Sequence, residues 1–199
     1  KFRKKEIASK KLKLDSNYEY LLYVGRLSKN KGIEEILNAF TKLKKDYSNL
    51  KLIFVGDGPL LNQIKDHTKK NNLSNDVILP GRLTHEITCY YYNISSVLLN
   101  IGMSGGLANV IIEAIASKLP IIATDVGASK DYVGNKMNNG ILINSINELE
   151  IKNAIVEIIL NQKKYRNLNE NKLEKFTFDY FGKKLNETYM ELLNKWYFS

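Results

Sequence analysis

Short apolar runs alternate with amphipathic stretches along most of the chain. The apolar runs predict strands at 18–24, 51–55, 77–79, 97–100, 121–124 and 141–143. Between them, apolar residues at helical spacing predict helices, such as one from Ile33 to Tyr47 with lysines and glutamates on its other face. Strands that are apolar on both faces are typical of a parallel sheet with helices on both sides. The pattern therefore predicts an α/β, Rossmann-like, doubly wound parallel sheet, followed by C-terminal helices beyond residue 145, in which Leu149 contributes to an apolar stripe.

Ligands of doubly wound sheets bind outside the carboxyl ends of the strands, so the loops at those ends are the candidate site. They begin at Gly25, Gly56, Pro80, Ile101 and Asp125. The first loop, GRLSKNKG, carries Arg26 and Lys31 between two glycines. A guanidinium binds phosphate oxygens in a bidentate fork and an ammonium adds a point charge, so the pair suits a diphosphate. A solvated basic turn is the equal alternative.

One acid stands alone in an apolar helix, in the stretch NVIIEAIA at 109–116. Glu113 is flanked by valine, isoleucine and alanine, so we expect it to be buried, and a buried charge is costly unless hydrogen bonds compensate. The preceding Gly105 and Gly106 let a ligand approach the backbone, and free amides near Asn109 favour an anion. Glu113 shares a face with Asn109 and is placed for a ribose diol. A core acid paired with Lys or Arg is the alternative.

Composition and charge narrow the class of protein. The chain has 199 residues, 44% of them hydrophobic, which suffices for one domain with a core. No run of about 18 apolar residues is present, and the single Cys89 excludes an internal disulfide, so we expect a soluble chain in the cytoplasm. Seven basic residues and one acidic residue precede position 14, so six of the nine net positive charges lie there. We interpret that segment as a solvated tail, with anionic lipid at the inner face of the cytoplasmic membrane as the alternative.

The sequence gives only weak signals for other catalytic or metal-binding residues. His67 lies among charged residues on a helix and is expected to be exposed, and His85 follows Thr84 at a helix start. Two isolated histidines and one cysteine give no metal-ligand spacing, so we expect neither a metal nor a cofactor. The fingerprint GxGxxG is absent, which argues against a dehydrogenase, and so is a GxSxG elbow. The GDGP sequence at 56–59 predicts a tight turn and, second, a wall of a donor site.

Four segments occur together in one order. They read YVGRLSKNKG, FVGDGP, VILPGR and GLANVIIEAIASKLPIIATDVG. In this order and spacing they resemble the C-terminal half of retaining GT-B glycosyltransferases of family four, over nearly the whole chain from residue 18. The resemblance implies that a nucleotide sugar, with UDP-sugars first, is the substrate. It also implies a lipid-linked or glycan acceptor, as in lipopolysaccharide, O-antigen or capsule synthesis, and no nucleic-acid partner.

In this family the N-terminal domain receives the acceptor and the C-terminal domain holds the donor in the cleft between them. The resemblance assigns the diphosphate to Arg26 and Lys31, the ribose to Glu113, the base to Pro80, Gly81 and Arg82, and the donor-loop backbone to Gly25, Gly105, Gly106, Leu107, Ala108 and Asn109. It implies that cations stabilise the leaving nucleoside diphosphate without a required metal, and that the anomeric configuration is retained.

The chain departs from the family pattern at three places. The family has two glutamates separated by seven residues, and the first of them is Gly105 here. A common proline is Ala108, and the usual Pro-Ser is replaced by Ile101 and Gly102. Because the missing Glu normally contacts the transferred sugar or supports its reacting face, we assign no catalytic residue. A nucleotide-sugar-binding relic or regulator therefore stays an alternative, beside a basic membrane-surface or nucleic-acid binder.

The resemblance also suggests how the chain is divided. We interpret residues 1–17 as the basic remnant of an interdomain link, and residues 18–199 as the donor-binding domain. Since the sequence shows no acceptor domain before the sheet, we interpret the chain as part of a longer enzyme. By itself it is expected to bind donor and to transfer little.

Overall fold

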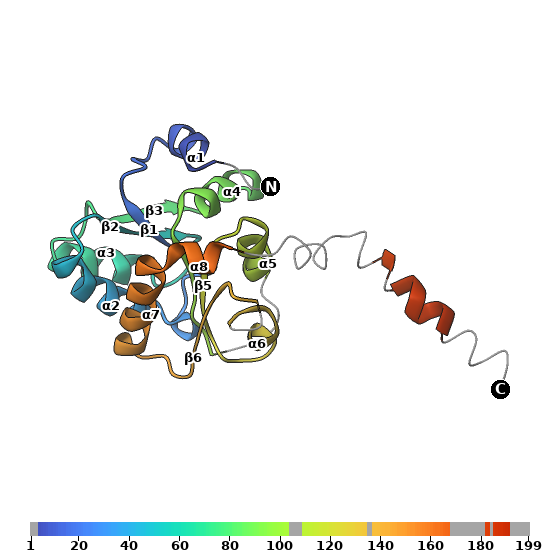
Figure 1. The fold of residues 1–199 in the computed structure, drawn as a ribbon. Coiled ribbons are helices and arrows are strands. Elements are labelled where there is room, and N and C mark those ends of the chain that lie inside the picture. Colours follow the sequence, from blue (N-terminus) through green and yellow to red (C-terminus); the bar gives the residue numbers. More distant parts are fainter. Residues whose placement is uncertain (1–3, 104–108, 135–136, 168–181, 184, 192–199) are drawn as a thin grey trace. The chain divides into compact units, whose positions relative to one another are not determined.

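A six-stranded parallel sheet forms the centre of the first of two units, Lys1–Asn167 and Leu168–Ser199 (Figure 1). The computed structural model describes residues 4–103, 109–134, 137–167, 182–183 and 185–191. The strands are β1 (Glu19–Val24), β2 (Leu50–Val55), β3 (Val77–Gly81), β4 (Val97–Asn100), β5 (Ile121–Thr124) and β6 (Gly140–Ile143). Each lies within two residues of a strand that the apolar runs predict.

The strand order is β3-β2-β1-β4-β5-β6, and all neighbouring strands are parallel. The chain moves outward from β1 to β3, returns to place β4 beside β1, and moves outward again to β6. This order confirms the predicted doubly wound, Rossmann-like α/β fold. The reversal between β1 and β4 leaves a crevice at the carboxyl ends of these strands, where ligands of such sheets bind.

Helices cover both faces of the sheet. They are α1 (Lys5–Leu12), the 3-10 turn η1 (Lys29–Lys31), α2 (Ile33–Asp46), α3 (Leu61–Lys70), α4 (His85–Ile94), α5 (Asn109–Ala116), α6 (Ser129–Tyr132), α7 (Glu148–Leu160) and α8 (Gln162–Arg166). On one face α2 contacts α3 and α7, and on the other α4 contacts α1 and α5 (Figure 1). None of the helices in the described part of the chain is long and apolar enough to cross a bilayer.

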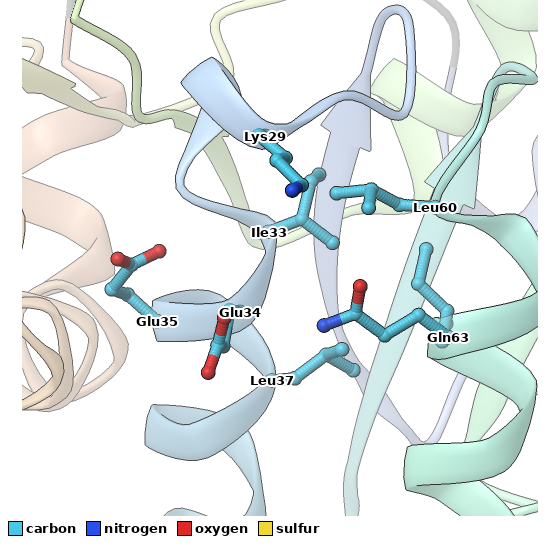
Figure 2. Close-up of a pocket in the computed structure, with 8 residues that line it drawn as sticks. Lys29, Ile33, Glu34, Glu35, Leu37, Leu60 and Gln63 are labelled. Atoms are coloured by element: carbon cyan, nitrogen blue, oxygen red, sulfur yellow. The ribbon is translucent and has the colours of Figure 1, made fainter.

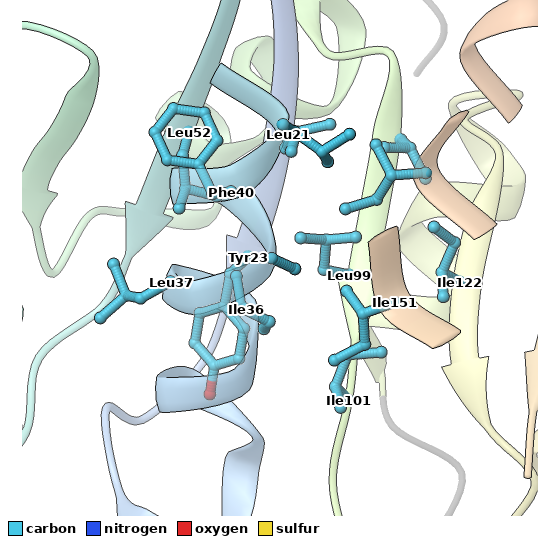
Figure 3. Packing of buried hydrophobic residues seen from close by; sticks show 14 of the residues in the cluster. Leu21, Tyr23, Ile36, Leu37, Phe40, Leu52, Leu99, Ile101, Ile122 and Ile151 are labelled. Atoms are coloured by element: carbon cyan, nitrogen blue, oxygen red, sulfur yellow. The ribbon is translucent and has the colours of Figure 1, made fainter. Parts of the chain in front are cut away.

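Helix α2 shows how the sequence specifies one of these elements. Acidic residues occupy its first turn and lysines its last, which complements the helix dipole, and Gly32 precedes it with a φ of 63°. Its buried stripe consists of Ile33, Ile36, Leu37, Ala39, Phe40 and Leu43. Figure 3 shows Phe40 and Ile36 turned toward Leu21, Tyr23 and Leu52 of the sheet. Burying each large apolar side chain of this kind contributes about 1.5–3 kcal/mol.

The basic leading segment is a packed helix where it is described, so its interpretation as a solvated tail is wrong. Residues 5–12 form α1, which contacts α4, and Ala8 is fully buried. Lys5 donates a hydrogen bond to the carbonyl of Tyr18 at 3.3 Å, which ties the helix to the start of β1. The other lysines of α1 stay on its outer side, which explains why the charge pattern alone indicates a solvated segment.

The C-terminal helices differ from the prediction in one detail. Helix α7 buries Ile151, Ile155 and Ile158 against the sheet, as expected, but Leu149 is 65% exposed and lies outside that stripe. In the second unit residues 185–191 are helical, in the last stretch that the sequence predicts to be helical. Three apolar positions of that predicted helix, Leu192, Leu193 and Trp196, lie outside the described residues.

His67 is half-buried, which corrects the expectation that it is exposed. Its Nε2 lies 2.9 Å from Thr41 Oγ1 on α2, so the ring joins α3 to α2. Burial lowers the pKa of His67, and Lys70 adds to this, while Glu34 acts in the opposite direction. The folded protein therefore favours the neutral ring.

This lowered pKa predicts a pH dependence of stability. Between the folded pKa and the ordinary value of about 6.5, the unfolded chain binds more protons than the folded one. The free energy of unfolding should therefore fall as the pH drops below about 6.5. In His67→Asn the free energy of unfolding should depend less on pH over this range, because the titrating ring is gone. Urea unfolding of both proteins at pH 5.5 and 7.5 measures the difference. Equal slopes for the two proteins would contradict the prediction.

Candidate functional site

The loops at the carboxyl ends of β1, β2 and β3 are joined by backbone hydrogen bonds. Leu27 N–H donates to the carbonyl of Asp57 at 2.9 Å, and Gly56 N–H donates to the carbonyl of Gly81 at 2.9 Å. The side chain of Asp57 accepts from Gly58 N–H at 2.7 Å. These bonds fix the three loops relative to one another and form a rigid edge over the crevice.

Two adjoining hollows open at this edge. The first, which we call the Arg82 hollow, has a volume of about 510 Å³ and is lined by both Arg26 and Arg82. Its lining consists of Val24, Gly25, Arg26, Val55, Gly56, Asp57, Gly58, Arg82, Leu83 and Thr88. Gly56, Asp57 and Gly58 of the GDGP turn therefore line this hollow, and the interpretation of the turn as a wall of a donor site stays a prediction.

The second, which we call the Lys31 hollow, has a volume of about 310 Å³ and extends over β4 and β5. It shares Val24, Gly25 and Arg26 with the first, and its other lining residues are Tyr23, Lys31, Asn100, Ile101, Gly102, Val110, Val126 and Ser129. A Cβ atom at Gly102 would lie 4.0 Å from Lys31 Nζ and 3.3 Å from the carbonyl oxygen of Asn30. Gly102 thus lies against the backbone of Asn30 and beside the Lys31 side chain.

The two hollows carry more positive than negative charge. Arg26, Lys31 and Arg82 line them, whereas Asp57 is the one acidic residue in the linings. Within the ranges that the structure describes, none of the three cations has a carboxylate partner at salt-bridge distance. Unpaired cations gathered at one crevice attract an anionic ligand of matching size.

Glu113 is placed differently from the prediction. Its side chain is 27% exposed, so it is not fully buried. Tyr92 OH donates a hydrogen bond to its Oε2 at 2.6 Å, and His85 Nδ1 lies 3.3 Å from its Oε1. Its partners are thus a tyrosine and a histidine of α4, not the Lys or Arg that the alternative interpretation expected. The sequence did not indicate these two contacts, and none of Glu113, Tyr92 and His85 is among the residues that line the hollows.

Helix α4 connects Glu113 to the hollows. Thr88, one turn after His85, lines the Arg82 hollow, and α4 contacts α5, which carries Glu113. Thr84 caps the helix, since its side chain accepts from Ile87 N–H at 3.4 Å. One helix therefore borders both the cationic hollow and the carboxylate.

The other residues that the sequence predicts for the site lie in different places. Arg82 lines a hollow, whereas Pro80 and Gly81 form the end of β3 and are not among the lining residues. Asn109 is the exposed first residue of α5. The predicted donor-loop residues Gly105, Gly106, Leu107 and Ala108 lie outside the described residues. Among the residues that are described, no three His, Cys, Asp or Glu side chains come together as a metal site requires.

A further pocket lies between α2 and α3. It has a volume of about 360 Å³, and Figure 2 shows Leu37, Leu60 and Gln63 around it, with Lys29 at its end. Glu34 and Glu35 also line it, so two carboxylates outnumber the single lysine. This pocket is unsuited to a polyanion, and the two hollows at the strand ends are the better candidate site.

The doubly wound sheet has the fold of a Rossmann-like GT-B domain, and comparison with known proteins gives the family. The chain belongs to the family "Glycosyl transferases group 1", whose model matches residues 4–175. That range includes α1. Among characterised relatives, the alpha-monoglucosyldiacylglycerol synthase of Streptococcus pneumoniae is 27% identical over 193 residues, which are 95% of this chain and 42% of the relative. The chain spans about half the length of the curated relatives it matches.

Solved structures agree with the fold. The C-terminal domain of a glycosyl transferase group 1 family protein from Francisella tularensis superposes with a TM-score of 0.72 at 20% identity, over 83% of this chain and 89% of that domain. An Anabaena protein solved in complex with UDP and glucose superposes with a TM-score of 0.78 at 18% identity, over 94% of this chain and 51% of that one. The first match confirms that this fold is the C-terminal half of a GT-B enzyme.

Proposed function

We propose that the chain is the donor-binding domain of a retaining glycosyltransferase and that it binds a nucleotide sugar, with UDP-sugars as the first class to test. One observation carries the proposal: Arg26, Lys31 and Arg82 meet at one crevice and have no carboxylate partner among the described residues. Their charge suits a diphosphate, which a guanidinium can bind with two parallel hydrogen bonds. The similar Anabaena fold that holds UDP supports a uridine nucleotide.

In the reaction that we propose, the bond between the anomeric carbon and the diphosphate breaks as the acceptor oxygen bonds to that carbon on the same face of the sugar. The proton of the acceptor hydroxyl passes to an oxygen of the departing diphosphate. Negative charge develops on the leaving diphosphate, between Arg26 and Lys31. Cations that are already in place stabilise this charge without reorganisation, so they lower the barrier more than they tighten ground-state binding. We propose that these side chains take the role that a metal ion has in other transferases.

The acceptor belongs to the part of the enzyme that this chain does not cover. A lipid-linked or glycan acceptor is our proposal, and the streptococcal relative, named for a glucosylated diacylglycerol, supports the lipid. An enzyme with such an acceptor works in the cytoplasm against the inner face of the membrane. The lysines of α1 suit contact with anionic headgroups there.

Titration of the chain with UDP, GDP and ADP by calorimetry tests the proposed function. We expect UDP to bind, and Glu113→Ala to raise its Kd about tenfold, because hydrogen bonds to a charged group contribute about 1.5–3 kcal/mol. Gln63→Ala, which changes the pocket of Figure 2 and neither hollow, should bind UDP as the wild type does. If none of the three nucleotides binds, the proposal is wrong.

The alternative of a nucleotide-binding relic, raised by Gly105, is separated from an active enzyme by a second measurement. The full-length gene product is assayed for transfer of a radiolabelled sugar to a lipid-linked acceptor. Transfer that Glu113→Ala abolishes excludes the relic. Nucleotide binding without transfer supports it.

A further inference from the structure

Both oxygens of the Glu113 carboxylate have partners on the same helix. Tyr92 OH donates to Oε2 at 2.6 Å, and His85 Nδ1 lies 3.3 Å from Oε1. The ring of His85 also reaches Cys89, whose Sγ lies 3.7 Å from Nε2. A neutral ring with its proton on Nδ1 satisfies both contacts, since it donates to Glu113 and accepts from the thiol.

The two partners differ in how firmly they are held. Tyr92 is 1% exposed, whereas the side chain of His85 is 71% exposed. Burial raises the pKa of Tyr92 far above its ordinary value, and its bond to Glu113 raises it further, so the hydroxyl stays protonated and donates. Tyr92 therefore binds Glu113 Oε2 from the protein interior, whereas His85 contacts Glu113 Oε1 from the solvent side.

The Glu113 carboxylate can accept further hydrogen bonds from a ligand. Each carboxylate oxygen can accept about two hydrogen bonds, and among the described residues each has one polar protein contact. The side chain is 27% exposed, so its remaining lone pairs can be reached from the solvent. A carboxylate that is fixed at both oxygens and still accessible is preorganised to accept from two neighbouring hydroxyl groups.

We propose that Tyr92 is the positioning residue of the ribose subsite: it fixes the Glu113 carboxylate for the 2′- and 3′-hydroxyls of the nucleotide, and His85 steadies the second oxygen. This inference rests on the proposed function and deepens it. Tyr92 acts through Glu113 and does not itself touch the ligand. The alternative is that its hydroxyl merely satisfies a buried polar group, and that Glu113 needs no support.

Discrimination between UDP and 2′-deoxy-UDP distinguishes these alternatives. Calorimetry on the full chain should show that the wild type binds UDP about tenfold more tightly than 2′-deoxy-UDP, because the deoxy compound lacks one hydrogen bond to a charged acceptor. Tyr92→Phe should weaken the binding of UDP, which uses both hydroxyls, more than that of 2′-deoxy-UDP, which keeps only the 3′-hydroxyl, so that the ratio of the two affinities falls from about ten to about three. A purely structural hydroxyl would affect both ligands equally.

Tyr91→Phe is the matched control. Tyr91 lies on the same helix and is buried to 7% exposure, and its hydroxyl has no hydrogen bond to Glu113. The Tyr91→Phe variant should keep the tenfold ratio between the affinities for UDP and 2′-deoxy-UDP. A retained ratio in Tyr92→Phe would overturn this inference and leave the proposed function intact, as would a wild type that binds both nucleotides equally. Absence of binding by UDP, GDP and ADP would instead overturn the proposed function itself.

Discussion

Replacing Gly56 by alanine is expected to lower the free energy of unfolding by about 3–5 kcal/mol, the largest effect on stability of any change considered for this chain. A Cβ atom at this position would lie 1.9 Å from the carbonyl oxygen of Gly25, in the neighbouring loop. The obstacle is backbone, so it cannot rotate away as a side chain would. Gly56 also has a φ of 138°, which disfavours any residue with a side chain.

Gly81→Ala is the matched control for this prediction. Gly81, the last residue of β3, lies at the same edge and also has a positive φ, of 77°, but among the described residues no atom lies within 4 Å of its Cβ position. It should cost about 1–2 kcal/mol, the strain of a left-handed backbone alone. Urea unfolding followed by circular dichroism measures both variants. Equal losses for the two would show that close approach of the first two loops contributes nothing.

The close approach of these loops requires glycine at two positions. Gly56 lets the loop after β2 lie directly on the loop after β1, and Gly58 does the same against Leu27, whose carbonyl oxygen would be 2.3 Å from its Cβ. The wall of the Arg82 hollow is thus built from backbone, with the cations projecting from it. Rigid backbone keeps these charges in place before a ligand arrives, which is the condition for binding without reorganisation.

The sheet could be predicted from sequence because its signal is local. The runs at 97–100 and 121–124 have the same bounds as β4 and β5, since a strand buried on both faces must be apolar throughout. The cationic loop was predictable for a related reason. Parallel strands bring their carboxyl ends to one edge, so Arg26 and Arg82 had to lie near each other once the strands were known.

The environment of Glu113 could not be predicted in the same way. Its bond to Tyr92 joins two helices, and the two residues are 21 positions apart in the chain. Nothing in the run of three tyrosines at 90–92 indicates which hydroxyl faces the carboxylate. His67 and Thr41 are 26 positions apart and were missed for the same reason. Contacts of this kind depend on how helices rotate against one another, which the hydrophobic pattern constrains only coarsely.

The sequence did not predict that helix α1 packs on the domain, because only one small side chain of this charged helix is buried. Among its residues Ala8 alone is buried, and three of the other seven are lysines, so the segment lacks the broad apolar stripe that predicts a packed helix. The small side chain of Ala8 lets α1 pack close to α4, yet one alanine adds little to the hydrophobic pattern of the sequence. Charge-rich segments next to a domain can therefore be part of it.

Arg26→Ala is expected to raise the Kd of UDP about 30-fold, the largest effect on binding among the predictions. The change removes a cation that lines both hollows, and a bidentate guanidinium–phosphate contact contributes about 2 kcal/mol. Uridine lacks phosphates, so its affinity should be unchanged. The wild-type Kd of UDP should also rise with salt concentration, because the contact is partly exposed.

Lys29→Ala is the control that separates a specific contact from general positive charge. Lys29 belongs to the same loop and carries the same charge as Lys31, but it lines the pocket between α2 and α3 and neither hollow (Figure 2). Calorimetry should show at most a twofold change in its Kd for UDP, since a distant exposed charge is largely screened. Equal losses in Lys29→Ala and Arg26→Ala would mean that nucleotide binding responds to the net charge of the loop. A 30-fold loss confined to Arg26→Ala would instead locate the diphosphate where the two hollows meet.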